Sequence, residues 1–126
     1  FEKEINVFKK LNQLDEYPVG FPKLVSLGCT KYFYYYVMER LGRNLKKVHA
    51  KSKNLKIELK KVISIGLQLV DRLELLHSQG LVHKDLKPAN VCFGLGNSED
   101  PSSDNSKILY LIDYGLTQKV SEKKKC

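Results

Sequence analysis

Residues 83–90 have the sequence HKDLKPAN, and residues 113–115, which follow a strand-like apolar run at 108–112, have the sequence DYG. Together these stretches hold, at recognisable offsets, the groups that phosphoryl transfer needs: a carboxylate for the acceptor hydroxyl, an amine for phosphate charge, and oxygen ligands for magnesium. The alternative is a chance grouping of solvated loop charges, but the octapeptide is far more specific than an isolated His-x-Asp triplet. The sequence therefore predicts a catalytic loop.

This loop resembles that of protein kinases, and two further stretches narrow the resemblance. Residues 35–45, YYVMERLGRNL, are similar to the strand and hinge of casein kinase I, whose hinge contains MELLG, and residues 91–96, VCFGLG, are similar to that family's FLMGLG. The resemblance extends from residue 1 to about residue 120, with Tyr114 in place of the family's Phe. It implies an α+β protein with a partial bilobal protein-kinase fold, similar to casein kinase I serine/threonine kinases.

The resemblance assigns the chain to parts of one kinase domain. Residues 1–39 correspond to the end of the N-lobe and its sheet, residues 40–44 to the hinge, and residues 45–126 to the front of the helical C-lobe. The Gly-rich phosphate loop and the strand Lys of kinases lie before this region and have no counterpart in the 126 residues. We therefore expect the chain to be a central fragment of a longer kinase and to be inactive alone.

The resemblance also implies a role for each polar residue of the two motifs. Asp85 orients the substrate hydroxyl and accepts its proton, and Lys87 stabilises the charge on the transferred phosphoryl group. Asn90 and Asp113 hold Mg²⁺. Glu4 matches the helix Glu that pairs with the strand Lys of kinases, because residues 4–9 fit the pattern E-x-x-[IV]-[YF]-K. The alternative for Glu4 is an exposed helix acid.

The hinge resemblance implies an ATP site. Met38 corresponds to the gatekeeper, and the adenine would bond the backbone carbonyl of Glu39 and the backbone N–H of Leu41. Cys92 corresponds to the apolar residue beneath the adenine ring, and Ile112 to the apolar residue before the magnesium Asp. The alternative for Met38 is ordinary core packing, which is compatible with the gatekeeper role, and for Cys92 it is an inert buried thiol, which we favour.

Periodicity and turn residues predict the elements around these motifs. Apolar residues at helical spacing predict helices over residues 1–14 and about 57–78, and branched and aromatic residues predict a hairpin over 21–39. The polar stretch 94–107 predicts a mobile loop that lengthens a hairpin at little entropic cost, so Asn90 and Asp113 can stay adjacent. We expect His83 to be a packed residue that braces the DYG turn.

Composition argues against a disulfide-rich protein, a zinc protein, a membrane protein and a specific nucleic-acid binder. An odd count of three Cys gives no disulfide framework or zinc spacing, and no apolar stretch reaches the ~18 residues of a membrane span. These features favour a protein of the cytoplasm, the nucleus or both. The net charge of +8 is spread over lysines without interleaved aromatics, so we expect no specific nucleic-acid site. A basic nucleic-acid binder is a weaker alternative, which a steep salt dependence would reveal.

Two functional classes remain open from the sequence. One is a kinase that uses ATP and Mg²⁺ to phosphorylate Ser or Thr of protein substrates, including acidic or pre-phosphorylated sites. The other is a non-catalytic, kinase-like (pseudokinase) binding module. A Gly-rich loop and strand Lys upstream would favour the enzyme, and their absence would favour the binding module.

Overall fold

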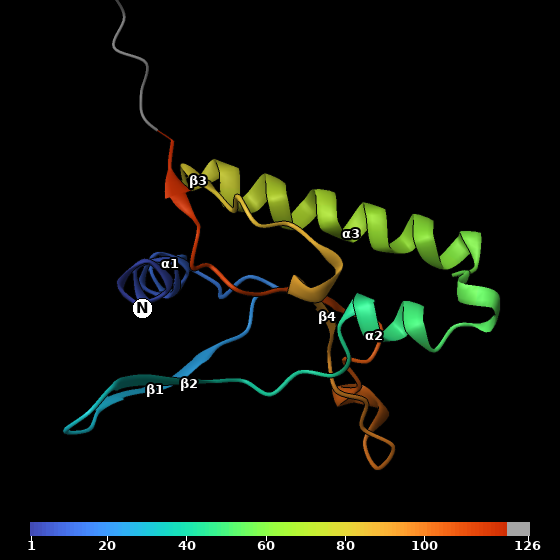
Figure 1. The fold of residues 1–126 in the computed structure, drawn as a ribbon, viewed down its shortest axis with the longest axis horizontal. Helices are drawn as coiled ribbons and strands as arrows, with labels where there is room; N and C mark the ends of the chain where they lie inside the picture. The colour runs from blue at the N-terminus through green and yellow to red at the C-terminus, as the bar shows by residue number, and fades with distance from the viewer. Residues whose placement is uncertain (121–126) are drawn as a thin grey trace, which may run out of the picture.

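The chain combines helices with short antiparallel strand pairs (Figure 1). The computed structural model describes residues 1–120. In order, its elements are α1 (Glu2–Asn12), β1 (Leu24–Cys29), β2 (Tyr34–Met38), α2 (Leu45–Ala50), η1 (Lys53–Leu55), α3 (Leu59–Ser78), β3 (Leu81–Val82), η2 (Pro88–Asn90), β4 (Val91–Phe93), η3 (Pro101–Ser103), β5 (Leu109–Leu111) and β6 (Gln118–Lys119). Strand β1 pairs with β2, β3 with β6 and β4 with β5. This arrangement confirms the predicted α+β class.

Helix α1 forms where apolar residues recur at helical spacing and the charges suit the helix dipole. Acidic residues lie in its first turn and basic residues in its last turn. Its buried residues are Ile5, Val7, Phe8 and Leu11. The helix ends at Asn12, slightly before the predicted end. Near that end Lys10 Nζ donates a hydrogen bond to the carbonyl oxygen of Gln79, which ties α1 to the end of α3.

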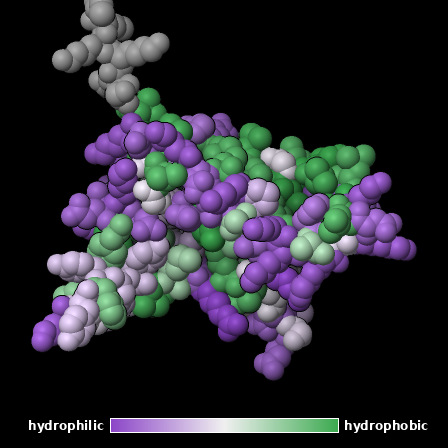
Figure 2. Space-filling model, viewed as in Figure 1, coloured by the Kyte–Doolittle hydropathy of each residue, from purple (hydrophilic) through white to green (hydrophobic). Residues whose placement is uncertain are grey.

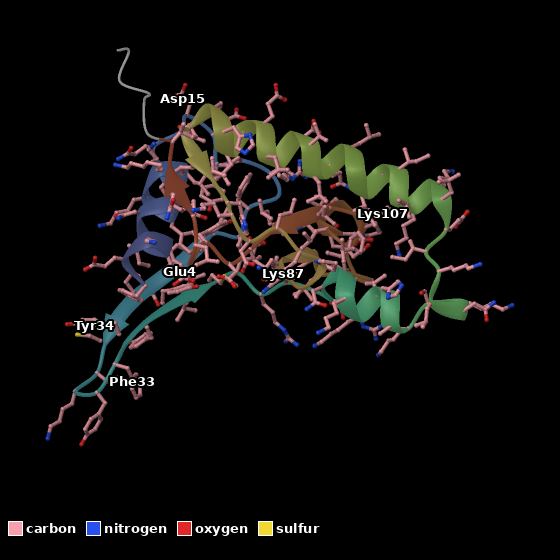
Figure 3. The ribbon with its side chains drawn as sticks, turned by 45° about the horizontal axis from the view of Figure 1, so that its top comes forward. Glu4, Asp15, Phe33, Tyr34, Lys87 and Lys107 are labelled. Atoms are coloured by element: carbon pink, nitrogen blue, oxygen red, sulfur yellow. The ribbon has the colours of Figure 1, made fainter. Side chains whose placement is uncertain are left out.

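The predicted hairpin is confirmed as the antiparallel pair β1–β2, which projects from the rest of the chain (Figure 1). At its tip the Thr30 hydroxyl accepts hydrogen bonds from the backbone N–H groups of Tyr32 and Phe33, which closes the turn. The aromatic side chains of Phe33 and Tyr34 are exposed on this hairpin (Figure 3). The two strands, Leu24–Cys29 and Tyr34–Met38, begin after and end before the limits of the predicted span 21–39.

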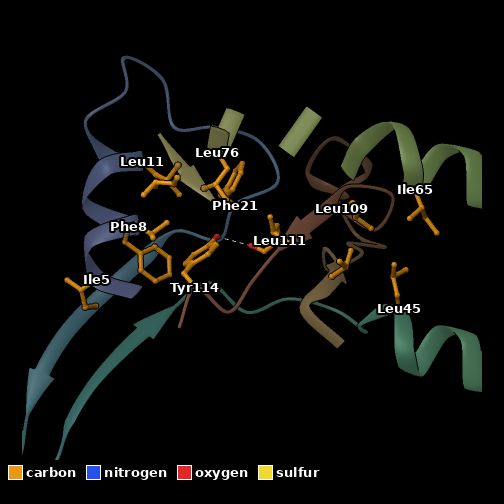
Figure 4. Close-up of a cluster of buried hydrophobic side chains, with 13 residues drawn as sticks. Ile5, Phe8, Leu11, Phe21, Leu45, Ile65, Leu76, Leu109, Leu111 and Tyr114 are labelled. Atoms are coloured by element: carbon orange, nitrogen blue, oxygen red, sulfur yellow. Dashed lines mark hydrogen bonds between the residues drawn. The ribbon is translucent and has the colours of Figure 1, made fainter. Parts of the chain in front are cut away.

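The core lies where α1, the end of α3, β5 and the DYG turn meet (Figure 4). Its largest fully buried side chains include Phe8, Phe21, Leu76, Leu111 and Tyr114. The Tyr114 ring meets the Phe8 ring edge-on at 5.4 Å, and its hydroxyl donates a 2.8 Å hydrogen bond to the carbonyl oxygen of Leu111. Each fully buried apolar side chain contributes roughly 1.5–3 kcal/mol. The core therefore fixes the DYG turn against α1.

Helix α3 precedes the predicted catalytic loop, residues 83–90, and ends close to the predicted boundary. Gly80 follows it with φ +69°, a left-handed conformation that glycine adopts without a Cβ clash. Only Ile65 and Leu76 of this helix are buried within the described residues, so the helix contributes fully buried side chains to the core at two positions of its length. None of the helices in residues 1–120 is long and apolar enough to cross a membrane.

Leu69, Leu73 and Leu75 of α3 are partly buried and pack against the core. Other apolar residues of the helix form an exposed face, seen as a green area over the helix in Figure 2. Its members are Leu59, Ile63, Leu67 and Val70, with exposed fractions of 72%, 55%, 65% and 63%. Gly66 lies on the same helix, and a Cβ added there would meet no atom within 4 Å. No contact within residues 1–120 therefore requires a glycine at position 66.

We expect Gly66→Ala to stabilise the 126-residue chain by roughly 0.5–1 kcal/mol, because alanine costs less backbone entropy in a helix interior and meets no steric obstacle here. Urea unfolding followed by circular dichroism measures the change, with Gly80→Ala as a control expected to destabilise, since Gly80 needs positive φ. Destabilisation by Gly66→Ala would mean that the exposed face of α3 is covered in solution.

Strands β4 and β5 form the second hairpin, with Val91 opposite Leu111 and Phe93 opposite Leu109. The predicted loop between them is confirmed in position, but it contains one turn of 3-10 helix that was not predicted. Asp100 caps this turn, because its Oδ1 accepts a hydrogen bond from the backbone N–H of Ser102. A short polar side chain therefore gives local order to a segment without apolar anchors.

Two polar side chains of α3 hold this hairpin. Gln68 donates to the carbonyl oxygen of Lys107 at 3.0 Å and accepts from the backbone N–H of Leu109 at 2.8 Å. Arg72 Nε donates to the carbonyl oxygen of Leu109 at 3.2 Å. These bonds satisfy backbone groups at the start of β5 and fix the hairpin relative to the helix.

Candidate active site

The loop before β4 is held by the amide of Asn90, which is only 5% exposed. Its Nδ2 donates to the backbone carbonyl of Asp85 at 2.9 Å and to Asp85 Oδ2 at 3.1 Å. The backbone N–H of Asn90 also bonds the carbonyl oxygen of Lys87 at 2.9 Å. One buried amide therefore positions both the backbone and the carboxylate of Asp85.

Lys87 completes this group. Its Nζ lies 3.5 Å from Asp85 Oδ2, with side-chain exposures of 53% for Lys87 and 25% for Asp85. An exposed ion pair of this kind contributes little to stability. The pair instead places an ammonium and a carboxylate side by side at the protein surface (Lys87 is labelled in Figure 3). There the carboxylate can contact a hydroxyl from solvent and the ammonium can contact a phosphoryl group.

Asp113 is brought next to this group by the backbone. The N–H of Ile112 donates to the carbonyl oxygen of Asn90 at 3.0 Å, so the residues predicted to hold magnesium lie on adjoining segments despite the long loop between them. Asp113 is exposed, has φ +63°, and accepts a hydrogen bond from the backbone N–H of Gly115 at 3.3 Å. Asp tolerates this left-handed conformation better than most residues.

Lys84 has a comparable backbone conformation, with φ +66°. Lysine lacks the short polar side chain that favours positive φ, so this position is strained. Its Nζ donates to Gln118 Oε1 at 2.8 Å, which links the catalytic loop to β6. Strain held in place by surrounding contacts is common at functional sites.

His83 connects the two motifs, as predicted. Its ring is 1% exposed, and Nδ1 accepts a hydrogen bond from the backbone N–H of Asp85 at 3.2 Å. Nε2 therefore carries the proton and donates to the carbonyl oxygen of Ile112 at 2.9 Å. The ring also meets Tyr114 edge-on at 6.1 Å. These contacts confirm that His83 braces the DYG turn.

The segment expected to be the hinge docks on β4. The backbone N–H of Gly42 donates to the carbonyl oxygen of Phe93 at 2.8 Å, and the N–H of Phe93 donates to the carbonyl oxygen of Arg43 at 3.0 Å. A Cβ at Gly42 would lie 2.8 Å from the carbonyl oxygen of Gly94, so only glycine allows this approach.

Three of the residues predicted to contact the nucleotide, Met38, Glu39 and Leu41, lie at the end of β2 and in this segment, and Ile112 follows β5. Met38 ends β2, and Met38, Glu39, Leu41 and Ile112 are all partly buried. The Glu39 backbone N–H already bonds the carbonyl oxygen of Lys23 at 2.8 Å, which leaves its carbonyl as the group for an adenine amine. Whether these residues bind ATP stays a prediction.

Cys92 lies beneath the hinge, opposite Tyr110, and is 6% exposed. Burial raises the pKa of its thiol, and the ammonium of Lys47 opposes this shift. No cation stands beside Cys92 in the sequence, so the effect of Lys47 could not be predicted from it. A buried thiol with a raised pKa is a poor nucleophile at neutral pH. The geometry therefore favours the inert alternative.

We expect a small maleimide to label Cys92 about ten times more slowly than the exposed Cys29, because burial and the raised pKa both reduce the reactive thiolate. Mass spectrometry of the adducts over time measures the two rates, and labelling in urea supplies the control in which they converge. Equal rates in the folded chain would contradict a buried Cys92. Cys126 lies outside the described residues.

Glu4 is held by a residue that sequence reasoning missed. Tyr36 in β2 donates its hydroxyl to Glu4 Oε1 at 2.9 Å, and the Tyr36 ring packs 5.7 Å from Phe8. Burial, the hydrogen bond to Glu4 and the charges of Glu4 and Asp113 raise the pKa of Tyr36 to about 12. No local pattern identifies this pair, because its members lie on separate elements. Glu4 therefore faces β2.

The donor set fits a magnesium ion that also binds phosphate oxygens. Because Nδ2 of Asn90 points to Asp85, the amide is oriented with Oδ1 as its possible ligand atom, and Asp113 adds a carboxylate. Mg²⁺ favours one or two protein oxygens together with phosphates and water. Residues 1–120 contain no cluster of three or more His, Cys, Asp or Glu side chains suited to a metal held by protein alone.

Comparisons with known proteins agree with this geometry. The family model described as "Protein kinase domain" matches residues 1–126. A probable serine/threonine-protein kinase of Dictyostelium discoideum is 37% identical over 116 residues, which cover 92% of this chain and 21% of that protein. A putative serine/threonine-protein kinase of Caenorhabditis elegans is 31% identical over 99 residues, covering 79% of this chain and 25% of that protein.

A putative casein kinase I of Caenorhabditis elegans is also similar to the chain. It is 32% identical over 98 residues, which cover 78% of this chain and 27% of that protein. The chain thus spans about a quarter of the length of the curated relatives that it matches.

Proposed function

The chain belongs to the protein kinase family, and on that basis we propose that it supplies the catalytic loop, hinge and magnesium residues of a protein serine/threonine kinase. The activity is proposed for the intact kinase, meaning a protein that carries residues 1–126 within a complete kinase domain. The main support is one observation: Asp85, Lys87 and Asn90 form a single bonded group that adjoins Asp113.

In this proposal each residue of the group acts by position and charge. The Asp85 carboxylate orients the Ser or Thr hydroxyl and accepts its proton as the hydroxyl attacks. The ammonium of Lys87 stabilises the negative charge on the oxygens of the phosphoryl group while it is transferred. Asn90 and Asp113 would hold Mg²⁺, which neutralises phosphate charge when bound. Glu4 would pair with a Lys outside residues 1–126.

ATP would lie against the hinge and above Cys92 of β4, under a Gly-rich loop outside residues 1–126. Glu39 and Leu41 would read the adenine through their backbone groups, Met38 would close the back of the site, and Cys92 and Ile112 would lie beneath the nucleotide. The docking of residues 42 and 43 on Phe93 supports this placement, because it brings the hinge over β4.

We further propose that the kinase is casein kinase I-like and acts on proteins, including acidic or pre-phosphorylated sites. The support is the hinge sequence, the similarity to a putative casein kinase I, and a net charge of +8. The odd cysteine count supports a location in the cytoplasm, the nucleus or both.

The test is a thermal shift of the intact kinase by ATP, with and without Mg²⁺, together with phosphate transfer from labelled ATP to casein. The enzyme proposal expects a Mg²⁺-dependent shift and transfer. The second candidate is a non-catalytic kinase-like binding module, in which Glu4 would hold Tyr36 through Oε1 without a catalytic Lys as its partner. A folded protein with no transfer would support that module and reject the enzyme.

Residues 1–126 alone are expected to show no measurable kinase activity, because they lack the Gly-rich loop and the strand Lys. The exposed apolar face of α3 should also make this fragment prone to aggregation. A filter assay of labelled phosphate on casein, with the intact kinase as positive control, measures the activity. Transfer by the purified fragment would refute this prediction.

A further inference from the structure

A groove of about 400 Å³ lies between the first turns of α3 and the β4–β5 hairpin. Ile65, 8% exposed, and Phe93 form its apolar part. Because side chains alternate along a strand, Phe93 faces away from the side on which Cys92 would meet the nucleotide. The groove is therefore distinct from the candidate active site.

Three lysines surround this groove: Lys60 and Lys61 from α3, and Lys107 from the segment before β5 (Figure 3 labels Lys107 beside the helix). Lys61 Nζ lies 5.2 Å from the centre of the Phe93 ring, a cation–π contact that holds the ammonium at the groove. Glu58 is the single acidic side chain among the described residues that line it. The groove thus combines an apolar floor with a positive rim.

The groove is also fixed in shape. Gln68, about one helical turn after Ser64 and Ile65, hydrogen-bonds the backbone of Lys107 and Leu109, and Arg72, one turn further on, hydrogen-bonds the backbone of Leu109. These bonds tie the two walls of the groove together. A groove that is already formed loses less entropy when it binds a ligand. Ser64 also lines the groove, and its hydroxyl is a possible hydrogen-bond partner for a peptide backbone.

We propose that this groove docks an acidic linear peptide segment of a partner protein. Asp or Glu side chains of that segment face Lys60, Lys61 and Lys107, and one apolar side chain sits over Ile65 and Phe93. The volume suits one or two side chains. A single-stranded nucleic acid fits less well, because the one aromatic ring of the groove is covered by Lys61 and offers no stacking surface.

The test uses binding, so it does not depend on phosphoryl transfer. The probe is a fluorescein-labelled decapeptide in which glutamates flank a Leu-Phe pair, titrated with the intact kinase and followed by fluorescence anisotropy. Two control peptides replace either the glutamates by glutamines or the Leu-Phe pair by serines. Both controls are expected to bind at least about tenfold more weakly.

Two variants of the protein locate the site. Lys60→Glu with Lys61→Glu reverses the rim charge, and Ser64→Trp fills the groove without changing charge; each should weaken binding of the acidic peptide by about tenfold or more. The matched control, Lys9→Glu with Lys31→Glu, makes the same charge change on α1 and the β1–β2 hairpin and should leave affinity unchanged. Circular dichroism confirms that each variant is folded.

Three results would overturn the proposal. If Lys9→Glu with Lys31→Glu weakened peptide binding as much as Lys60→Glu with Lys61→Glu, the peptide would be held by the overall positive charge of the protein. If Ser64→Trp bound the peptide with full affinity, the peptide would bind outside the groove. Tighter, equally variant-sensitive binding of a labelled oligothymidylate would make the groove a nucleic-acid site.

Discussion

Replacing Asp85 by Asn in the intact kinase lowers the maximal rate of phosphoryl transfer by about two to four orders of magnitude and leaves ATP affinity nearly unchanged. The carboxylate acts on the acceptor hydroxyl, and it contributes little to binding of the nucleotide in the ground state. Asparagine keeps the shape of the side chain and an oxygen that can accept the Asn90 Nδ2 bond. The loop should therefore stay folded while proton acceptance is lost.

The measurement is kcat and KM for ATP and casein, with ATP affinity taken separately from thermal shifts. Asp15→Asn is the matched control, because Asp15 is exposed and lies away from the loop (Figure 3), and it should have normal kinetics. Near-normal turnover of Asp85→Asn would remove Asp85 from catalysis. Loss of ATP binding by the same variant would show instead that Asp85 is needed for the structure of the site.

Replacing Asp113 by Asn in the intact kinase lowers ATP affinity, which Asp85→Asn leaves nearly unchanged. The part of ATP binding that depends on Mg²⁺ is lost. The expected loss of affinity for ATP with Mg²⁺ is at least about tenfold, the size seen when even an outer partner of a metal ligand is removed. Asn adopts positive φ as readily as Asp, so the backbone at φ +63° should not be disturbed. The lost negative charge on the metal ligand is then the main change.

Titration of ATP-induced thermal shifts in the presence and absence of Mg²⁺ measures this effect. Asp85→Asn serves as the comparison, because it should retain the Mg²⁺-dependent shift that Asp113→Asn loses. If Asp113→Asn kept the full Mg²⁺-dependent shift, the carboxylate would not be a magnesium ligand, and the binding-module alternative would gain support.

Local patterns in the sequence determined the elements and the motifs. Apolar spacing along α1 and α3 predicted both helices, because a helix repeats every 3.6 residues whatever surrounds it. The end of α3 was equally local, since Gly80 permits the positive φ that follows the helix. The grouping of Asp85, Lys87 and Asn90 was predictable because these polar residues lie within one octapeptide, 83–90, and so do not depend on distant parts of the chain.

Tertiary packing alone decided how these groups meet. The Tyr36 bond to Glu4 and the Gln68 bonds to the hairpin join residues that are far apart in the sequence. The groove beside Phe93 and the influence of Lys47 on Cys92 arise in the same way. Such contacts depend on the angle and separation at which finished elements pack, and no short-range period in the sequence encodes those quantities.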